Sequence, residues 1–171
     1  RLDAQLSSNW QQVIEHYRFD GRFLSPDASG TTDGKIRHLC DAIEIASAFG
    51  HQRNLFEAKS VIEQLQAWQS RSTGLFIEPG RQYQNPSERD PSALYNILCA
   101  GYALECFDAA PLHPISFVED LDADALVKWL DDLPWRERAW HCGATVDAIG
   151  TAFYFNQRYF GLGKNLAVLM G

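Results

Sequence analysis

Three carboxylates on two predicted helices are the residues best suited to acid–base chemistry. Asp41 and Glu44 are three residues apart, which places them at neighbouring positions on one helical face, and Asp147 lies on a later helical segment. Hydrolysis of a glycosidic bond uses two carboxylates roughly 5 to 10 Å apart whose pKa values differ. We therefore expect Asp41 or Glu44, together with Asp147, to be the catalytic residues.

A structural role for the same acids is the competing interpretation, and on the residues alone it is the favoured one. Arg37 precedes Asp41 by four residues, so an ion pair along the helix satisfies both charges. Asp147 pairs with Arg158 or serves as a cap in this interpretation. Polar groups on otherwise apolar helices need such partners or a wet cavity, because an unpaired buried charge is costly.

Aromatic and polar side chains accompany these acids. The stretch LPWRERAWHCGA, expected to be a short loop, holds Trp135, Trp140 and His141 beside two arginines. Aromatic rings next to polar donors suit sugar stacking, and they also suit simple capping of a helical end. The candidate substrate-binding residues are Asn96, Tyr154 and Arg158 in a cavity and Tyr83, Trp135 and Trp140 at its rim.

Motifs for other chemistries are incomplete. A zinc site built from His38, Cys40, His141 and Cys142 would have ligands too closely spaced within each pair. Asp90, directly before Pro91, is explained as a helix cap. The stretch GLGK at residue 161 is too short for a phosphate-binding loop and follows a helix. We therefore predict no metal and no cofactor.

Helical periodicity predicts the elements that carry these residues. Gly50 ends the first segment, Pro91 suits the first turn of the third, and Pro134 ends the fourth. No window predicts a strand, so the expected fold is all-α, a single domain over residues 1–171. The predicted segments are a leading helix at 6–17 and helices at 36–49, 55–69, 90–107, 122–133 and 144–160.

The predicted helices alternate in character. The first, third and fifth are rich in Ala, Gly and Cys and are apolar over much of their circumference, whereas the second and fourth are amphipathic. Similar segments recur after about 50 to 55 residues, each interval holding one helix pair. Such a pattern predicts helical hairpin repeats with buried and outer helices, arranged as a solenoid or a closed ring.

Between the second and third helices, the stretch TGLF (73–76) follows an outer helix and precedes a long connection. Gly74 permits a turn there, and Leu75 and Phe76 can plug the end of the core. This layout resembles the terpenoid-cyclase and prenyltransferase α/α-toroid superfamily, and also the (α/α)6 barrels of polysaccharide-processing enzymes. The resemblance covers residues 34–160 and implies part of an α/α toroid whose inner helices line a central cavity.

The chain departs from the motifs of those families. The acids of EDLDADAL (119–126) lack the D-x-D-D order, and DDLPW at residue 131 lacks the fifth-position acid of D-D-x-x-D. Cys40 and Asp41 stand in the reverse order to the D-x-C zinc motif. Acids in a first helical turn are explained by the helix dipole. Terpenoid processing therefore remains a second alternative.

Composition narrows the function classes. The 171 residues carry a net charge of −7, and the few lysines are not clustered, so nucleic acid is not an expected partner. No apolar run is long enough for membrane insertion. The four cysteines lie among apolar neighbours, which favours buried thiols and a cytoplasmic location. The apolar ending NLAVLMG indicates an excised piece, with contacts to a missing remainder of the chain.

Two functions of different class remain open on the sequence. The first is a carbohydrate-processing or carbohydrate-binding domain with a small-molecule or glycan substrate in an acidic cavity. The second is a non-catalytic helical repeat module that binds another protein.

Overall fold

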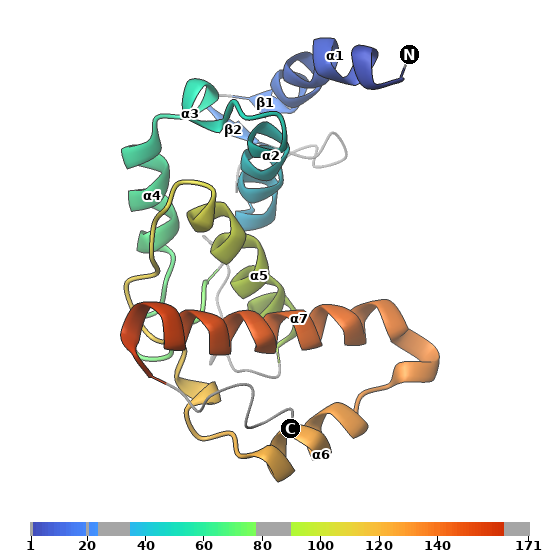
Figure 1. Cartoon of the computed structure of the whole chain (residues 1–171), viewed down its shortest axis with the longest axis vertical. Coiled ribbons are helices and arrows are strands. Elements are labelled where there is room, and N and C mark those ends of the chain that lie inside the picture. The colour runs from blue at the N-terminus through green and yellow to red at the C-terminus, as the bar shows by residue number, and fades with distance from the viewer. Residues whose placement is uncertain (1, 20, 24–34, 78–89, 163–171) are drawn as a thin grey trace.

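The computed structural model describes residues 2–19, 21–23, 35–77 and 90–162, and it shows an all-α fold with one minimal β-hairpin (Figure 1). Tyr83 and the other residues from 78 to 89, which belong to the long connection predicted after TGLF, lie outside the described residues. The helices are α1 (Leu2–His16), α2 (Ile36–Ala48), α3 (Gln52–Leu55), α4 (Ala58–Ala67), α5 (Pro91–Glu105), η1 (Ser116–Val118), α6 (Ala123–Asp131) and α7 (Trp135–Phe160).

Side-chain caps fix where three of these helices begin. Asp90 accepts a hydrogen bond of 2.8 Å from the backbone N–H of Ser92, which confirms its predicted capping role at α5. Asp122 caps α6 through the N–H of Ala125 at 2.8 Å. Glu57 caps α4, so the helix predicted at 55–69 begins at Ala58, and the separate short helix α3 precedes it.

A short hairpin forms where no strand is predicted. Strands β1 (Arg18–Phe19) and β2 (Arg22–Phe23) pair antiparallel, with Arg18 opposite Phe23. Gly21 adopts φ 73°, a left-handed conformation that glycine reaches without strain and that allows the tight turn. Strands of two residues are too short to leave an alternating pattern in the sequence, which explains why periodicity misses them.

The prediction of a loop at 133–144 is wrong, because residues 135–144 form the first part of α7. Pro134 occupies the position before the helix, and Arg, Glu and Ala, all good helix formers, follow it. The helix is interrupted at Arg138, whose φ of −140° and ψ of 45° are not helical. Figure 1 shows the ribbon turning sharply at this start of α7.

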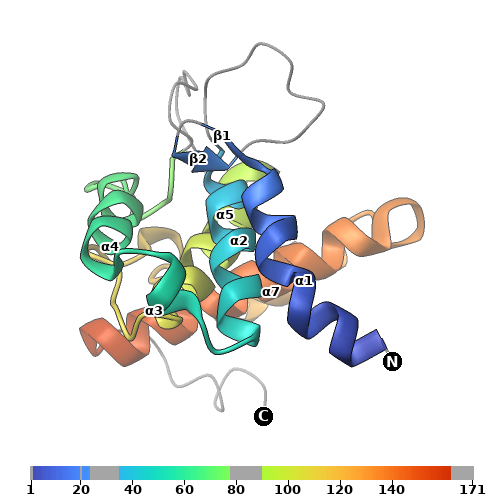
Figure 2. The ribbon, with the colours of Figure 1, turned by 90° about the horizontal axis from the view of Figure 1, so that it is seen from above.

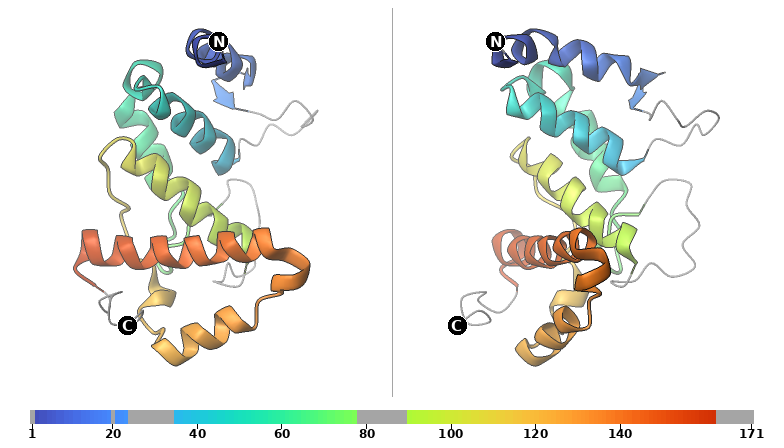
Figure 3. Two further views of the ribbon diagram at one scale, coloured as in Figure 1. Left: turned by 45° about the vertical axis from the view of Figure 1, so that its right-hand side comes forward. Right: turned by 90° about the vertical axis from the view of Figure 1, so that its right-hand side faces the viewer.

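The small-residue helices pack against one another, as predicted. Helices α2, α5 and α7 lie side by side in that order, with α5 in contact with both neighbours (Figures 1 and 3). Seen from above, α4 lies on one side of the pair formed by α2 and α5, and α1 lies on the other side of that pair (Figure 2). Helices α4 and α6 bury only one side each, at Val61, Leu65 and Trp129. The alternation of buried and outer helices is confirmed, and closure into a ring stays a prediction.

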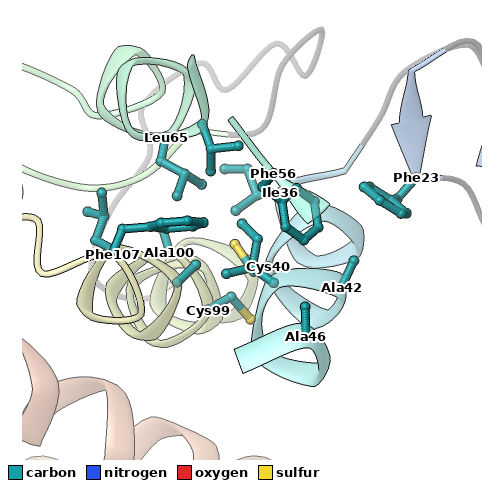
Figure 4. Close-up of a cluster of buried hydrophobic side chains, with 14 of the residues drawn as sticks. Phe23, Ile36, Cys40, Ala42, Ala46, Phe56, Leu65, Cys99, Ala100 and Phe107 are labelled. Carbon is teal, nitrogen blue, oxygen red and sulfur yellow. The ribbon is translucent and has the colours of Figure 1, made fainter. Parts of the chain in front are cut away.

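Two apolar cores meet at α5. In the first, Leu65 of α4 and Cys40 of α2 pack toward Phe107, just after α5 (Figure 4). In the second, Ile97 of α5 joins Phe153 of α7 and residues of η1 and α6. Because α5 contributes to both cores, it is buried over most of its circumference.

The turn TGLF forms as predicted, with Leu75 and Phe76 buried, and it joins the two cores. Gly74 adopts φ 71°, and the backbone N–H of Ser70 donates a 2.8 Å hydrogen bond to the carbonyl of Leu75. Leu75 and Phe76 are both almost fully buried, but Leu75 belongs to the second core and Phe76 to the first. Consecutive side chains of extended chain point to opposite sides, so one turn serves both cores.

Buried amides hold the segment that follows α5, residues 106–116, which we call the 106–116 connection. Gln69 accepts from the N–H of His113 at 3.0 Å and donates to its carbonyl at 2.8 Å. Asn156, fully buried on α7, bonds both the N–H and the carbonyl of Ile115, at 2.8 and 2.9 Å. These side chains satisfy backbone groups that lie outside regular secondary structure.

Candidate functional site

A groove of about 920 Å³ opens where the first turns of α2 and α5 face the first part of α7. Its size is at the upper end of typical ligand sites, which run from roughly 300 to 1,000 Å³. No carboxylate is found among the described residues that line it. The charged and aromatic residues that line it include Lys35, Arg37, Tyr95, Arg138, Trp140 and His141.

Arg37 is held in a defined orientation at the groove. Its Nε lies 3.2 Å from Oδ2 of Asp41, one helical turn further along α2. Its guanidinium also lies over the ring of Tyr95 on α5, 5.1 Å from the ring centroid. This pairing is the one the structural interpretation of the sequence predicts, and it links the groove to Asp41.

Beyond Arg37, ionisable groups continue along the seam between α2 and α5. Burial raises the pKa of the Glu44 carboxyl, and the negative charge of Asp41 raises it further. Burial and then the charges of Asp41 and Glu44 raise the pKa of the Cys99 thiol to about 12. Cys99 therefore stays protonated at neutral pH and is not a nucleophile. Glu44 is the acid of this seam whose protonated form the surroundings favour.

The two tryptophans at the start of α7 have different roles. The indole Nε1 of Trp135 donates a 2.7 Å hydrogen bond to the carbonyl of Leu130, at the end of α6. Trp135 does not line the groove, and this bond gives it the capping role that the sequence leaves as an alternative. Trp140 lines the groove and is 86% exposed. Figure 3 shows the corner that the chain makes between α6 and α7.

Tyr154 and Arg158 lie in a second polar cluster, at the far end of α7. Nη1 of Arg158 donates a 2.5 Å hydrogen bond to the hydroxyl of Tyr154, and its Nε lies 3.8 Å from Oε1 of Glu105. The hydroxyl of Tyr159 donates to the same Glu105. Burial, followed by this hydrogen bond, raises the pKa of Tyr159 to about 12. The cluster ties α5 to α7.

The remaining predicted residues are placed apart. Asp147 is exposed on α7, whereas Asp41 and Glu44 belong to α2, and α5 lies between these two helices (Figure 1). Asn96 borders the groove but is buried, and its amide donates a 3.2 Å hydrogen bond to the carbonyl of Phe76. Asn96 thus anchors the turn.

Sequence reasoning missed Lys35 and Tyr95 at the groove and Glu105 and Tyr159 at the second cluster. Tyr95 lies four residues before Cys99 on the polar strip of α5, so its spacing was the available signal. Lys35 precedes the first helix and carries no periodic signal.

Three of the four cysteines, Cys40, Cys99 and Cys142, are buried as predicted, and Cys106 is half-buried. Within the described ranges, no three His, Cys, Asp or Glu side chains are grouped to hold a metal ion. No helix in the part of the chain that the structure describes is long and apolar enough to cross a membrane. The chain matches no family model, no curated protein and no solved structure.

Proposed function

We propose that the groove binds a carbohydrate and that the chain is part of an α/α-toroid domain of a carbohydrate-binding or carbohydrate-processing protein. The observation that carries this proposal is Trp140, whose indole is 86% exposed at the edge of the groove. A stacked sugar ring would cover this apolar surface and remove it from water.

Polar donors around Trp140 support the same ligand class. The guanidinium of Arg37 is oriented by Asp41 and Tyr95, so it loses little freedom when it donates to a ligand oxygen. Ser92 and Thr145 also line the groove, and the hydroxyl of Thr145 donates to the carbonyl of His141 at 3.1 Å. Sugars present many hydroxyl groups, and fixed donors beside an aromatic ring match that surface.

For the processing form of the proposal, Glu44 is the proton donor. Because Glu44 does not line the groove, the ligand has to extend past Arg37 along the seam between α2 and α5 to reach it. Its pKa is raised by burial and by Asp41, which suits a general acid, and Arg37 joins this pair to the groove. Asp41 would be the partner carboxylate on the same helix. Asp147, on α7, stays the third candidate catalytic residue, for a ligand long enough to extend along the inner helices.

The test is the variant Trp140→Ala, titrated with neutral and acidic trisaccharides by calorimetry. We expect affinity to fall by about ten-fold or more, because the stacking surface is lost. The melting temperature should change by less than about 1 °C, because an exposed side chain contributes little to stability.

Trp135→Phe is the matched control, since it alters another tryptophan of the same segment that does not line the groove. We expect this variant to lose some stability and to keep its affinity for sugars. Sugar binding that is absent, or that survives unchanged in Trp140→Ala, would contradict the proposal. The non-catalytic helical repeat module would then account better for the chain.

A further inference from the structure

The charge of the groove is opposite to that of the whole chain. The sequence carries 22 acidic and 15 basic residues, for a net charge of −7. The groove nevertheless presents Lys35, Arg37 and Arg138, while no carboxylate is found among the described residues that line it. Low-dielectric walls on both sides concentrate the field of such cations inside a cleft, so the groove attracts anions.

Two of these cations have no ion-pair partner in the described parts of the chain. Lys35 and Arg138 are both exposed, and neither lies within 4.0 Å of a described carboxylate oxygen. Only Arg37 is paired, with Asp41. The groove therefore keeps positive charge that its own described residues do not neutralise.

Two separate segments bring the three cations together, and a third segment orients one of them. Lys35 directly precedes α2, Arg37 belongs to its first turn, and Arg138 lies at the interruption of α7. Tyr95, from the first half of α5, holds Arg37 between itself and Asp41. The convergence depends on the tertiary fold, because Arg138 is about 100 residues from the other two in sequence.

We propose, resting on the carbohydrate function above, that the groove selects an acidic glycan. Lys35, Arg37 and Arg138 bind a carboxylate or sulfate group of the sugar while the ring stacks on Trp140. Arginine suits this task because its planar guanidinium matches the two oxygens of such groups. The aromatic residue recognises the sugar and the cations recognise its charge, so the two contributions are separable by mutation.

The probes are trigalacturonate, its fully methyl-esterified form and a sulfated galactotriose, titrated into the full chain. The ester keeps the sugar rings and removes the charge. We expect the two acidic probes to bind at least about ten-fold more tightly than the ester at 50 mM salt. Raising the salt to 500 mM should reduce this preference, because the ligand charge is screened. Tighter binding of trigalacturonate than of the sulfated probe would identify carboxylate as the preferred group.

The matched variants are the double substitution Lys35→Gln with Arg138→Gln and the control Lys59→Gln with Lys128→Gln. Both remove two positive charges, but Lys59 and Lys128 lie on α4 and α6 and do not line the groove. We expect the first pair to weaken trigalacturonate by about ten-fold, with little effect on the ester. The control pair should leave both affinities nearly unchanged.

Equal affinity for the acid and the ester would overturn the charge selection and leave the carbohydrate function intact. An equal loss in the control pair would also overturn it, because net charge would then explain the effect. Failure of every probe to bind would overturn both proposals.

Discussion

The two ends of α5 use polar side chains in different ways. Beyond its carboxyl end, neutral amide side chains form hydrogen bonds with the backbone of the 106–116 connection. These side chains belong to α3, to α4, to the residues just after α4, and to α7. Gln52 donates to the carbonyl of Cys106 at 3.1 Å and Gln66 to that of Ala110 at 2.8 Å. At its amino end, Trp140 and Arg138 border a groove and face outward.

This difference separates stability from recognition. An amide that bonds buried backbone groups cannot be replaced without leaving those groups unsatisfied, which is costly. A cation or indole at the rim of a groove contributes little to folding, because it is hydrated before and after. We therefore expect substitutions near the 106–116 connection to change stability and those at the groove to change binding.

The largest loss of stability should come from Gly74→Ala, which adds a Cβ where the turn packs against the 106–116 connection. A Cβ at this position would lie 2.1 Å from the carbonyl oxygen of Pro114, and φ is 71°. Backbone overlap and left-handed strain together should lower the free energy of unfolding by about 4 kcal/mol. Urea denaturation followed by circular dichroism measures this loss.

Gly50→Ala is the control for backbone strain. Gly50 has the same φ of 71°, but no atom lies within 4 Å of an added Cβ. We expect a loss of only about 1 kcal/mol. Similar losses in the two variants would show that contact with Pro114 does not matter, and the contrast between the two ends would weaken.

A smaller loss should follow from Asn156→Leu. The substitution keeps the side-chain volume nearly constant and leaves the buried N–H and carbonyl of Ile115 without partners. We expect the free energy of unfolding to fall by about 3 kcal/mol. Asn54→Leu, which removes an exposed amide, should cost less than about 0.5 kcal/mol in the same denaturation experiment. A tolerated Asn156→Leu would argue against a structural role for this clamp.

The smallest effect concerns Glu44, on the seam between the two ends. Its folded pKa is raised by burial and by Asp41 above the ordinary value of 4.5, so ionisation destabilises the fold as pH rises through that range. Glu44→Gln should therefore raise the melting temperature at pH 7, by about 2 °C, and have little effect at pH 4. Asp147→Asn, at an exposed position of α7, is the control at both pH values. A gain at pH 4 equal to that at pH 7 would rule out this origin.

Local signals predicted the helices well. Asp90 and Asp122 cap helices near the predicted boundaries because capping depends on residues only two or three positions away. The packing of the small-residue helices also followed from composition, since Ala, Gly and Cys allow close approach. Gly101 illustrates this on α5, because an added Cβ would lie 2.3 Å from the ring of Phe155.

The groove was harder to predict, because it depends on the tertiary fold. Arg138 reaches it only because α7 is interrupted at this residue, an irregularity without a periodic signal. The amide clamps are equally non-local, since Asn156 and Ile115 are 41 residues apart in sequence. The stripe of Arg37, Asp41 and Glu44 was predictable from spacing, but its relation to Asp147 depends on the position of α5.

The adjacent residues Leu75 and Phe76 have a consequence for how the molecule unfolds. Since one peptide unit anchors side chains in both apolar cores, neither core can open without pulling on the other. The two cores should therefore unfold in a single cooperative transition, with coincident midpoints from calorimetry and spectroscopy. We therefore expect no hinge motion between the two cores, because Leu75 and Phe76 hold them together through one peptide unit.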